Sequence, residues 1–337
     1  MNNKSIKQFI LAGDLGATNL RLALFDIANP QYQAVEERKF AVKEFNSLEE
    51  ILNIYTNNLT VEIIGASFAV AGPVINGVAK ITNVDWKIIE ESLSENLKGI
   101  PVSLQNDLVG MSSSIPILQP DHLININPGQ VVENGAVAVI APGTGLGEGF
   151  LVSINGEYQA FQSEGGHSDF GPRNDLEMDL LKYLRSKYSR VSYERICSGL
   201  GIPDLYQFLK ERGDQKESPV LANELLNAQD KTPLIINAAT PEKDPDPLSY
   251  ATMKLFVNIL GAEAGNLALK VVASGGVYIG GGIPPRIIPL LRKHFLEAFF
   301  DKGRFQNLME TIPVSIIIHP QPALLGSARV GIINLIK

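Results

Sequence analysis

Short apolar runs separated by turn residues dominate the pattern along the chain. Residues 9–12 and 21–27 form two such runs, joined by the turn Gly13-Asp-Leu-Gly-Ala-Thr-Asn19. Both alternating faces of the second run are largely apolar, which is typical of an internal strand. The pattern therefore predicts two strands and a glycine-containing turn at the start of the chain.

The same pattern returns in the middle of the chain. A strand is expected at 137–141, a glycine turn at 142–149 and a second strand at 150–154, followed by Asn155-Gly156. Asn-Gly between apolar runs is a strong signal for a β-hairpin. The repeat predicts an α/β protein with two lobes, each of which opens on a strand–turn–strand unit.

Helical spacing of apolar residues appears between these units. Leu48, Ile51, Leu52 and Tyr55 predict an amphipathic helix over 47–59, which Ser47 and Glu50 would begin as a capping box. Further helices are expected at 175–188, 248–272, 285–300 and from 323, and further strands at 63–70, 102–104 and 314–318.

Two polar segments bear on the domain organisation. Residues 115–133, with three prolines and several asparagines, are expected to be a hinge and crossing between domains. Residues 215–247, which contain five prolines, are expected to be a peripheral addition. We therefore expect a small α/β domain formed by 1–117 plus 317–337 and a large α/β domain formed by 118–316.

Composition narrows the class of protein. The chain has 337 residues, of which 45% are hydrophobic, and 29 basic against 36 acidic residues give a net charge of −7. This balance argues against a nucleic-acid partner. The single cysteine, Cys197, excludes an intrachain disulfide and favours a reducing, cytoplasmic location. The most apolar long segment contains Glu263 and Lys270, so no membrane span is expected.

The first candidate for chemistry is the turn Gly13–Asn19. Glycines allow backbone N–H groups to face an anion, and Thr18 and Asn19 add polar side chains. Phosphate would repel the carboxylate of Asp14, which suggests that Asp14 acts through a metal ion or its water. A plain hairpin turn is the alternative.

Two further glycine clusters could hold a nucleotide. The first, Gly143-Thr-Gly-Leu-Gly-Glu-Gly149, has Glu148 where a dinucleotide-binding loop has its third glycine, and the chain contains no Gly-Lys pair, which excludes a Walker A loop. The second, Gly275–Gly282, has five glycines in eight residues, against which a flat group such as adenine could lie. Turns without a ligand are the alternative for both clusters.

Polar groups concentrate at two other places. Asn106 and Asp107 follow an apolar strand, which makes Asp107 a candidate general base. Glu164-Gly-Gly-His-Ser-Asp169 suits a polyhydroxyl ligand, with a metal site or helix capping as alternatives. Glu194 alone would be interpreted as a solvated charge, and Cys197 as a small buried hydrophobe.

Taken together and in order, these motifs resemble those of bacterial ATP-dependent glucokinases, a group related to hexokinase, actin and the Hsp70 ATPase domain. The matching segments cover essentially the whole chain. They are Gly13–Arg21, Asn106-Asp107, Gly143–Gly147, Glu164–Phe170, Tyr193–Arg195, Gly280–Arg286, Asp301–Phe305 and Leu324–Ser327. The resemblance implies a two-lobed actin/hexokinase-like ATPase fold with a ligand cleft between the domains.

The resemblance also implies residue roles. Asp107 would be the base, and the glucose-binding set would be Asn106, Asp107, Glu164, His167 and Glu194. The nucleotide would contact Gly13, Asp14, Leu15, Gly16, Ala17, Thr18, Asn19, Gly143, Thr144, Gly145, Gly280, Gly281 and Gly282, with Asp14 near Mg²⁺ through water. Ala17 replaces a glycine of the family, which requires a negative φ there.

The reaction implied by the resemblance is transfer of the γ-phosphoryl group of Mg·ATP to the 6-hydroxyl of D-glucose. Its partners would be glucose and ATP, in a cytoplasmic homodimer. A kinase of mannose, fructose or an amino sugar is the alternative enzyme, and an actin-like or Hsp70-like nucleotide switch is the alternative from another class.

Overall fold

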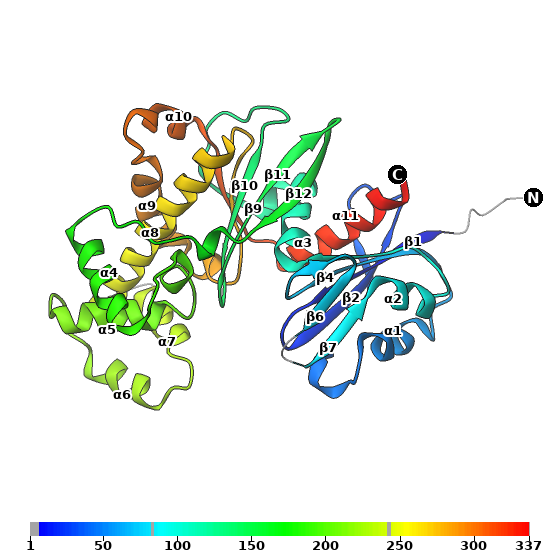
Figure 1. Ribbon diagram of the computed structural model, residues 1–337, viewed down its shortest axis with the longest axis horizontal. Coiled ribbons are helices and arrows are strands. Elements are labelled where there is room, and N and C mark those ends of the chain that lie inside the picture. The colour runs from blue at the N-terminus through cyan, green and yellow to red at the C-terminus, as the bar shows by residue number, and fades with distance from the viewer. Residues whose placement is uncertain (1–6, 82–83, 241–243, 337) are drawn as a thin grey trace, which may run out of the picture. The chain divides into compact units, whose positions relative to one another are not determined.

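The computed structural model describes residues 7–81, 84–240 and 244–336 (Figure 1). Its contacts separate two compact units. The first comprises Met1–Gln119, Tyr158–Gln162 and His319–Lys337, and the second comprises Pro120–Glu157 and Ser163–Ile318. The domain boundaries expected from the sequence remain a prediction. They place the short segment Tyr158–Gln162 in the large domain, whereas its contacts assign it to the first unit.

The first unit is built on a five-stranded sheet in the order β3-β2-β1-β4-β8. Strand β2 is antiparallel to β1 and β3, whereas β4 is parallel to both β1 and β8. The strands are β1 (Gln8–Leu15), β2 (Asn19–Asp26), β3 (Ala34–Ala41), β4 (Glu62–Val70) and β8 (Val102–Asn106). Pairing of Asp14 with Arg21 extends the hairpin, so the turn is shorter than predicted.

Helices cover both faces of this sheet. Neighbouring strand residues face opposite sides, so Leu11 packs with α1 (Leu48–Thr56) and Ala12 packs with α11 (Pro322–Ile336) (Figure 1). Helix α1 begins as predicted, with Ser47 Oγ accepting a hydrogen bond from Glu50 N at 3.3 Å. The unit also contains α2 (Glu90–Asn96), α3 (Asp107–Ser114) and a small sheet of β5 (Val74–Ile75), β6 (Val78–Ile81) and β7 (Trp86–Ile89).

The main sheet of the second unit repeats this arrangement. Its order is β12-β11-β10-β13-β14-β9, with β10, β13 and β14 parallel to one another. The strands are β9 (Leu123–Asn127), β10 (Val137–Pro142), β11 (Leu146–Ile154), β13 (Gly276–Ile279) and β14 (Val314–Ile317). The edge strand β12 (Glu157–Ser163) consists mainly of Tyr158–Gln162, the segment whose contacts assign it to the first unit. The Asn155-Gly156 hairpin is confirmed, with φ of 55° and 86° at its two residues.

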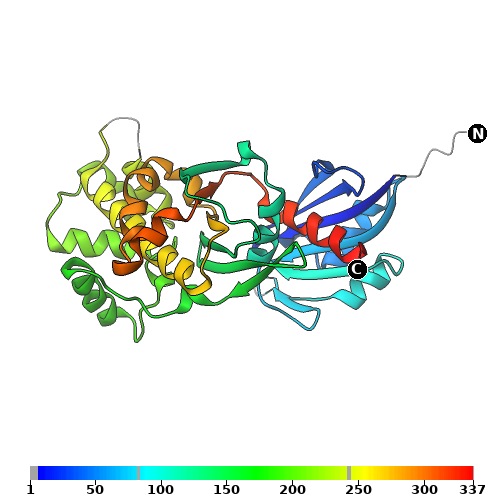
Figure 2. The same cartoon turned by 90° about the horizontal axis from the view of Figure 1, so that it is seen from above.

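Helix α8 (Pro247–Val271) lies at the centre of the helical part of the second unit. It packs against α5 (Ile202–Arg212), α7 (Thr232–Ala239) and α9 (Ile288–Phe300), and Figures 1 and 2 show α8 beside α9. Gly261 and Gly265 allow this approach, because a methyl group on either would meet a backbone carbonyl of α9. The unit also contains α4 (Asp175–Lys187), α6 (Pro219–Asn227) and α10 (Gln306–Thr311). None of the helices formed by described residues combines the length and apolar character that a membrane crossing requires.

One of the two expectations about polar segments is wrong. The segment 215–247 is not peripheral, because α6 and α7 contribute Leu221, Leu225, Ile235 and Ile236 to the core. Three of its prolines, Pro219, Pro233 and Pro247, lie in the first turns of α6, α7 and α8, where a missing N–H costs nothing. The segment 115–133 contains the crossing from the first unit to the second, between Gln119 and Pro120, as expected. It also contains strand β9, which was not expected and which pairs with β14.

The contact between α3 and α11 predicts a graded response to two substitutions in α11. A methyl group at Gly326 would collide with the backbone of Gly110, whereas one at Gly331 would meet the side chain of Ile10. We expect Gly326→Ala to cost about 3 kcal/mol, because two helix backbones must separate, and Gly331→Ala to cost about 1–2 kcal/mol, because a buried side chain and not a backbone must shift. Urea unfolding of both variants measures the difference, and equal losses would contradict the helix contact.

Candidate active site

In the first unit, three predicted residues gather where parallel strands end. Asp14 pairs with Ala69 of β4, and the next residue of β4 pairs with Asn106 at the end of β8. Asn106 caps α3, since its Oδ1 accepts a hydrogen bond from Leu108 N at 2.9 Å. Asp107 is the first residue of α3, so a strand end and a helix start hold it together.

The surroundings of Asp14 and Asp107 disfavour the ionised form of both carboxyl groups. Burial and the charge of Asp107 raise the pKa of Asp14 to about 6, although Arg21 opposes the shift. Burial also raises the pKa of Asp107, against the hydrogen bond from Leu108 N. Two partly desolvated carboxylates with one nearby guanidinium favour a cation, and oxygen donors suit Mg²⁺.

The first glycine turn is smaller than expected from the sequence. Gly13, Asp14 and Leu15 belong to β1, and Leu15 is fully buried. The turn itself is closed by Gly16 N donating to Asn19 O at 3.0 Å, and Asn19 Nδ2 donates to Thr18 Oγ1 at 2.8 Å. Ala17 is exposed and does not have a positive φ, so the condition for replacing glycine there is met.

In the second unit, three predicted sugar ligands come together around His167. Its Nδ1 lies 3.8 Å from Glu164 Oε2, and its Nε2 lies 3.6 Å from Glu194 Oε1. The side chains of Glu164 and His167 are 84% and 59% exposed, whereas that of Glu194 is 29% exposed. The arrangement presents two carboxylates and an imidazole to solvent, which suits vicinal hydroxyl groups.

Glu194 also contacts the second glycine loop. Its Oε2 accepts a hydrogen bond from Leu146 N at 3.1 Å, and a methyl group on Gly145 would crowd the same carboxylate. The loop turns by a hydrogen bond from Gly143 N to Gly145 O at 2.9 Å and leaves Thr144 exposed. Glu164, His167 and Glu194, which we call the polar set of the second unit, therefore lie beside the glycine loop Gly143–Gly145 within one unit.

The third glycine cluster packs beside the second. Gly280 N donates to Ile140 O at 2.9 Å. Gly281 has a φ of 89° and lies against Pro142 O, so this position requires glycine. A methyl group on Gly282 or on Gly143 would meet nothing within 4 Å. Both loops thus lie at the end of β10, with open space beside one glycine of each.

Asp169 and Cys197 do not take part in the contacts of Glu164, His167 and Glu194. Asp169 forms an exposed ion pair with Arg190 at 2.6 Å, and Cys197 is fully buried, as expected of a small hydrophobe. The described residues contain no cluster of three or more His, Cys, Asp or Glu side chains that could hold a metal ion.

Glu148 is a residue to which no sequence motif assigns a role. It lies in β11 and not in a turn, and it is 1% exposed. Leu146, Glu148 and Phe150 are spaced two residues apart, which places them on one face of a strand. That spacing could have indicated a strand here, but the turn expected over 142–149 concealed it.

Comparison with known proteins identifies the family. The glucokinase family model matches residues 11–331. The glucokinase of Trichormus variabilis is 39% identical over 339 residues, covering 95% of this chain and 97% of its own. The glucokinase of Shigella sonnei is 35% identical over 321 residues, covering 95% and 96%. The chain belongs to the glucokinase family.

Solved structures agree with the family assignment. A glucokinase from an Antarctic psychrotroph superposes with a TM-score of 0.81 at 30% identity, covering 96% of this chain and 98% of its own. A glucokinase from Balamuthia mandrillaris, in complex with glucose, shares the fold with a TM-score of 0.77 at 22% identity, covering 98% and 95%. The expected α/β fold class and the expected enzyme class, a sugar kinase of the glucokinase family, are confirmed.

The carboxyl pair of the first unit predicts that Asp14 lowers stability in the ligand-free enzyme. A raised pKa means that ionising Asp14 in the fold costs free energy, a cost present above pH 6 and absent below the ordinary pKa of 3.8. We therefore expect Asp14→Asn to raise the stability at pH 7.5 by about 2 kcal/mol in buffer without Mg²⁺. Thermal unfolding measures the gain.

The matched control is Asp26, at the end of β2 in the same sheet. A hydrogen bond from Ala28 N and the nearby Lys7 lower the pKa of Asp26, so its charge is favourable. Asp26→Asn should give no gain in stability. A loss of stability in Asp14→Asn would contradict the repulsion between Asp14 and Asp107.

Proposed function

We propose that this chain transfers the γ-phosphoryl group of ATP to the 6-hydroxyl of D-glucose, giving glucose 6-phosphate and ADP. The observation that carries the proposal is the double contact of Glu194, which lies beside His167 and also accepts the N–H of Leu146 at the glycine loop. Groups suited to a polyhydroxyl ligand thereby adjoin groups suited to a polyphosphate.

Asp107 is the general base of this proposal. The 6-hydroxyl oxygen attacks the γ-phosphorus, the bond to the β,γ-bridging oxygen breaks, and the hydroxyl proton moves to the Asp107 carboxylate. Burial raises the pKa of Asp107, which strengthens it as a base, while the Leu108 N–H holds one of its oxygens in place. Asn106, Glu164, His167 and Glu194 would orient the sugar.

The phosphates of ATP would lie along Gly16–Asn19 and Gly143–Gly145, and the adenosine along Gly280–Gly282. Backbone N–H groups are suited to this charge because they need no reorganisation. Asp14 would hold Mg²⁺ through water, and charge neutralisation of the transferring group is what Mg²⁺ supplies when bound. The family resemblance further suggests a cytoplasmic homodimer, which size-exclusion chromatography with light scattering can test for its oligomeric state.

A panel of sugars in a coupled ADP-release assay tests the reaction. We expect ADP release that depends on glucose and exceeds the release with mannose, fructose or glucosamine at equal concentration. Faster turnover of another hexose would replace glucose as the substrate. ATP hydrolysis that no sugar stimulates would contradict the kinase reaction itself.

Substitutions separate the base from the sugar ligands. We expect Asp107→Asn to lower kcat by about 100-fold or more, because an amide cannot accept the proton, while the Kd for glucose changes by less than about fivefold. Glu164→Ala should instead raise the Kd and KM for glucose by about tenfold. Turnover near the wild-type value in Asp107→Asn would remove Asp107 as the base, and unchanged glucose affinity in Glu164→Ala would remove that ligand.

The nucleotide site predicts a contrast between neighbouring glycines. Gly282→Ala has room for its methyl group and no positive φ, so it should fold with an unchanged melting temperature. If adenosine lies against this backbone, the KM for ATP should rise by about tenfold while the KM for glucose stays constant. Gly281→Ala is the control, since strain at φ 89° should lower the melting temperature itself. An unchanged KM for ATP in Gly282→Ala would exclude Gly282 from the site.

A further inference from the structure

Glu148 occupies a buried place with no hydrogen-bond partner. It lies opposite Ile140 in the β10–β11 pair, and neither of its carboxylate oxygens has a partner among the described residues. Its Oε2 faces the backbone of Gly165, where a methyl group would overlap it. A carboxyl group in the core without partners is costly unless it is neutral or serves a purpose.

A second buried carboxylate stands beside it. Glu263 of α8 is fully buried, and its Oε2 accepts a hydrogen bond from Asn266 Nδ2 at 2.9 Å. Lys270 Nζ lies 3.6 Å from Glu263 Oε1, which supplies one positive charge for two acids. Burial and the charge of Glu263 raise the pKa of Glu148 to about 8, against Lys270. Glu148 is therefore mainly neutral at pH 7 and ionised above pH 8.

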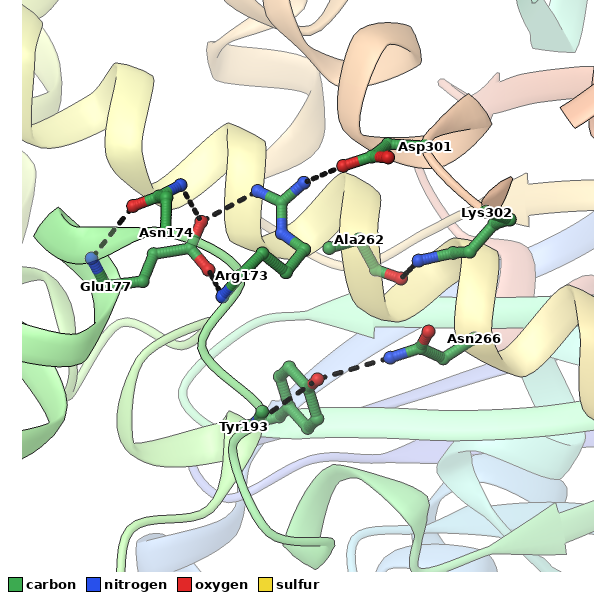
Figure 3. Close-up of polar contacts among 9 residues, drawn as sticks. Arg173, Asn174, Glu177, Tyr193, Ala262, Asn266, Asp301 and Lys302 are labelled. Atoms are coloured by element: carbon green, nitrogen blue, oxygen red, sulfur yellow. Dashed lines mark hydrogen bonds and ion pairs between the residues drawn. The ribbon is translucent and has the colours of Figure 1, made fainter. Parts of the chain in front are cut away.

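Glu148 and Glu263 lie next to the two turns that carry Glu164, His167 and Glu194, the second of them through Asn266. Glu148 touches Gly165, which follows Glu164 directly. On the other side, Asn266 Nδ2 also donates to Tyr193 Oη at 3.2 Å, as Figure 3 shows, and Tyr193 precedes Glu194. One buried cluster thus lies behind the turn Gly165–His167 and behind the turn Tyr193–Arg195.

We propose that Glu148 is a positioning residue, whose buried side chain fills the space beneath Gly165 and holds the turn Gly165–His167 in the geometry that binds the sugar. This inference rests on the proposed role of Glu164 and His167 as sugar ligands. Ionisation would place two like charges side by side in the core. Gly165 has no side chain to anchor it, so the turn above Glu148 is the neighbour that would move.

The other charged groups around the pair have partners of their own. Lys302 Nζ donates to Ala262 O at 2.9 Å, and the carboxylate of Glu177 is held by Arg173 at 2.7 Å (Figure 3). The further titratable groups that face the pair or lie on the supported turn are Tyr193, Cys197, Lys270, Glu164 and His167. All of them remain in a variant that changes Glu148 alone.

The pH dependence of glucose binding tests the role of Glu148. In the wild type, the KM for glucose should rise by about fivefold or more from pH 7 to pH 9, as Glu148 ionises. In Glu148→Gln, which keeps the shape without the charge, the rise should be less than about twofold, and kcat at pH 7 should stay within about threefold of the wild type. Parallel KM profiles in the two proteins would overturn the proposal.

A double-mutant cycle tests the contact without relying on pH. Gly165→Ala should lower the melting temperature and raise the KM for glucose, because its methyl group collides with Glu148 Oε2. Adding Glu148→Ala should restore part of both losses, because the shortened side chain makes room.

Gly166→Ala is the control for this cycle. Its methyl group would meet the backbone oxygen of Leu146, so its loss of melting temperature should simply add to that of Glu148→Ala. Additive losses for Gly165→Ala and Glu148→Ala would also overturn the proposal.

The infrared band of a protonated carboxyl group separates this inference from the proposed function. The difference between the spectra of the wild type and Glu148→Gln at pH 7 should contain that band, whatever substrate the enzyme uses, because the other carboxyl groups are common to both proteins. If the band and the cycle in melting temperature are found but glucose elicits no ADP release, the proposed function fails while the supported turn stands. If glucose is phosphorylated and the band is missing, the inference about Glu148 fails alone.

Discussion

Pairing between parallel strands determines where chemistry can occur in each unit. In the first unit, β4 pairs with β1 and β8 in a register that brings Asp14 and Asn106 to the same edge of the sheet. In the second unit, β10 and β13 pair so that the two glycine loops leave the sheet together. A shift of one residue in either register would turn these groups to the opposite face. The approach of Asp14 to Asn106 and the approach of the two glycine loops to each other depend on this register.

The sequence predicted the elements that depend on local signals. The cap at Ser47 and the turn at Asn155-Gly156 are set by a few neighbouring residues, and both were found where expected. The prolines of 215–247 were misinterpreted because the same residue marks loops and helix starts. Strand β9 was missed because its alternating Ile and Asn resemble a polar connection until β14 pairs with it.

The residues of the candidate site likewise divide into those with a local sequence signal and those that only long-range contacts reveal. Asp107 was found because a strand end precedes it in the sequence, although only the structure shows that it also begins α3. Glu194 carried no local signal, since its contacts with His167 and Leu146 join residues 27 and 48 positions away along the chain. Family resemblance alone drew attention to it. Burial of Glu148 likewise follows from the packing of α8 and the Gly165 turn, which no local pattern encodes.

The double contact of Glu194 has a thermodynamic consequence. One oxygen of this carboxylate is available beside His167, while the other accepts the N–H of Leu146 at the glycine loop. A ligand that redistributes charge on the first oxygen changes the strength of the second hydrogen bond, and the reverse also holds. If the sugar and the phosphates bind on the two sides of Glu194 as proposed, each ligand changes the affinity for the other by the same factor, because linkage between two binding events is reciprocal. Under that proposal, a single side chain would be sufficient to make the affinities for acceptor and donor interdependent.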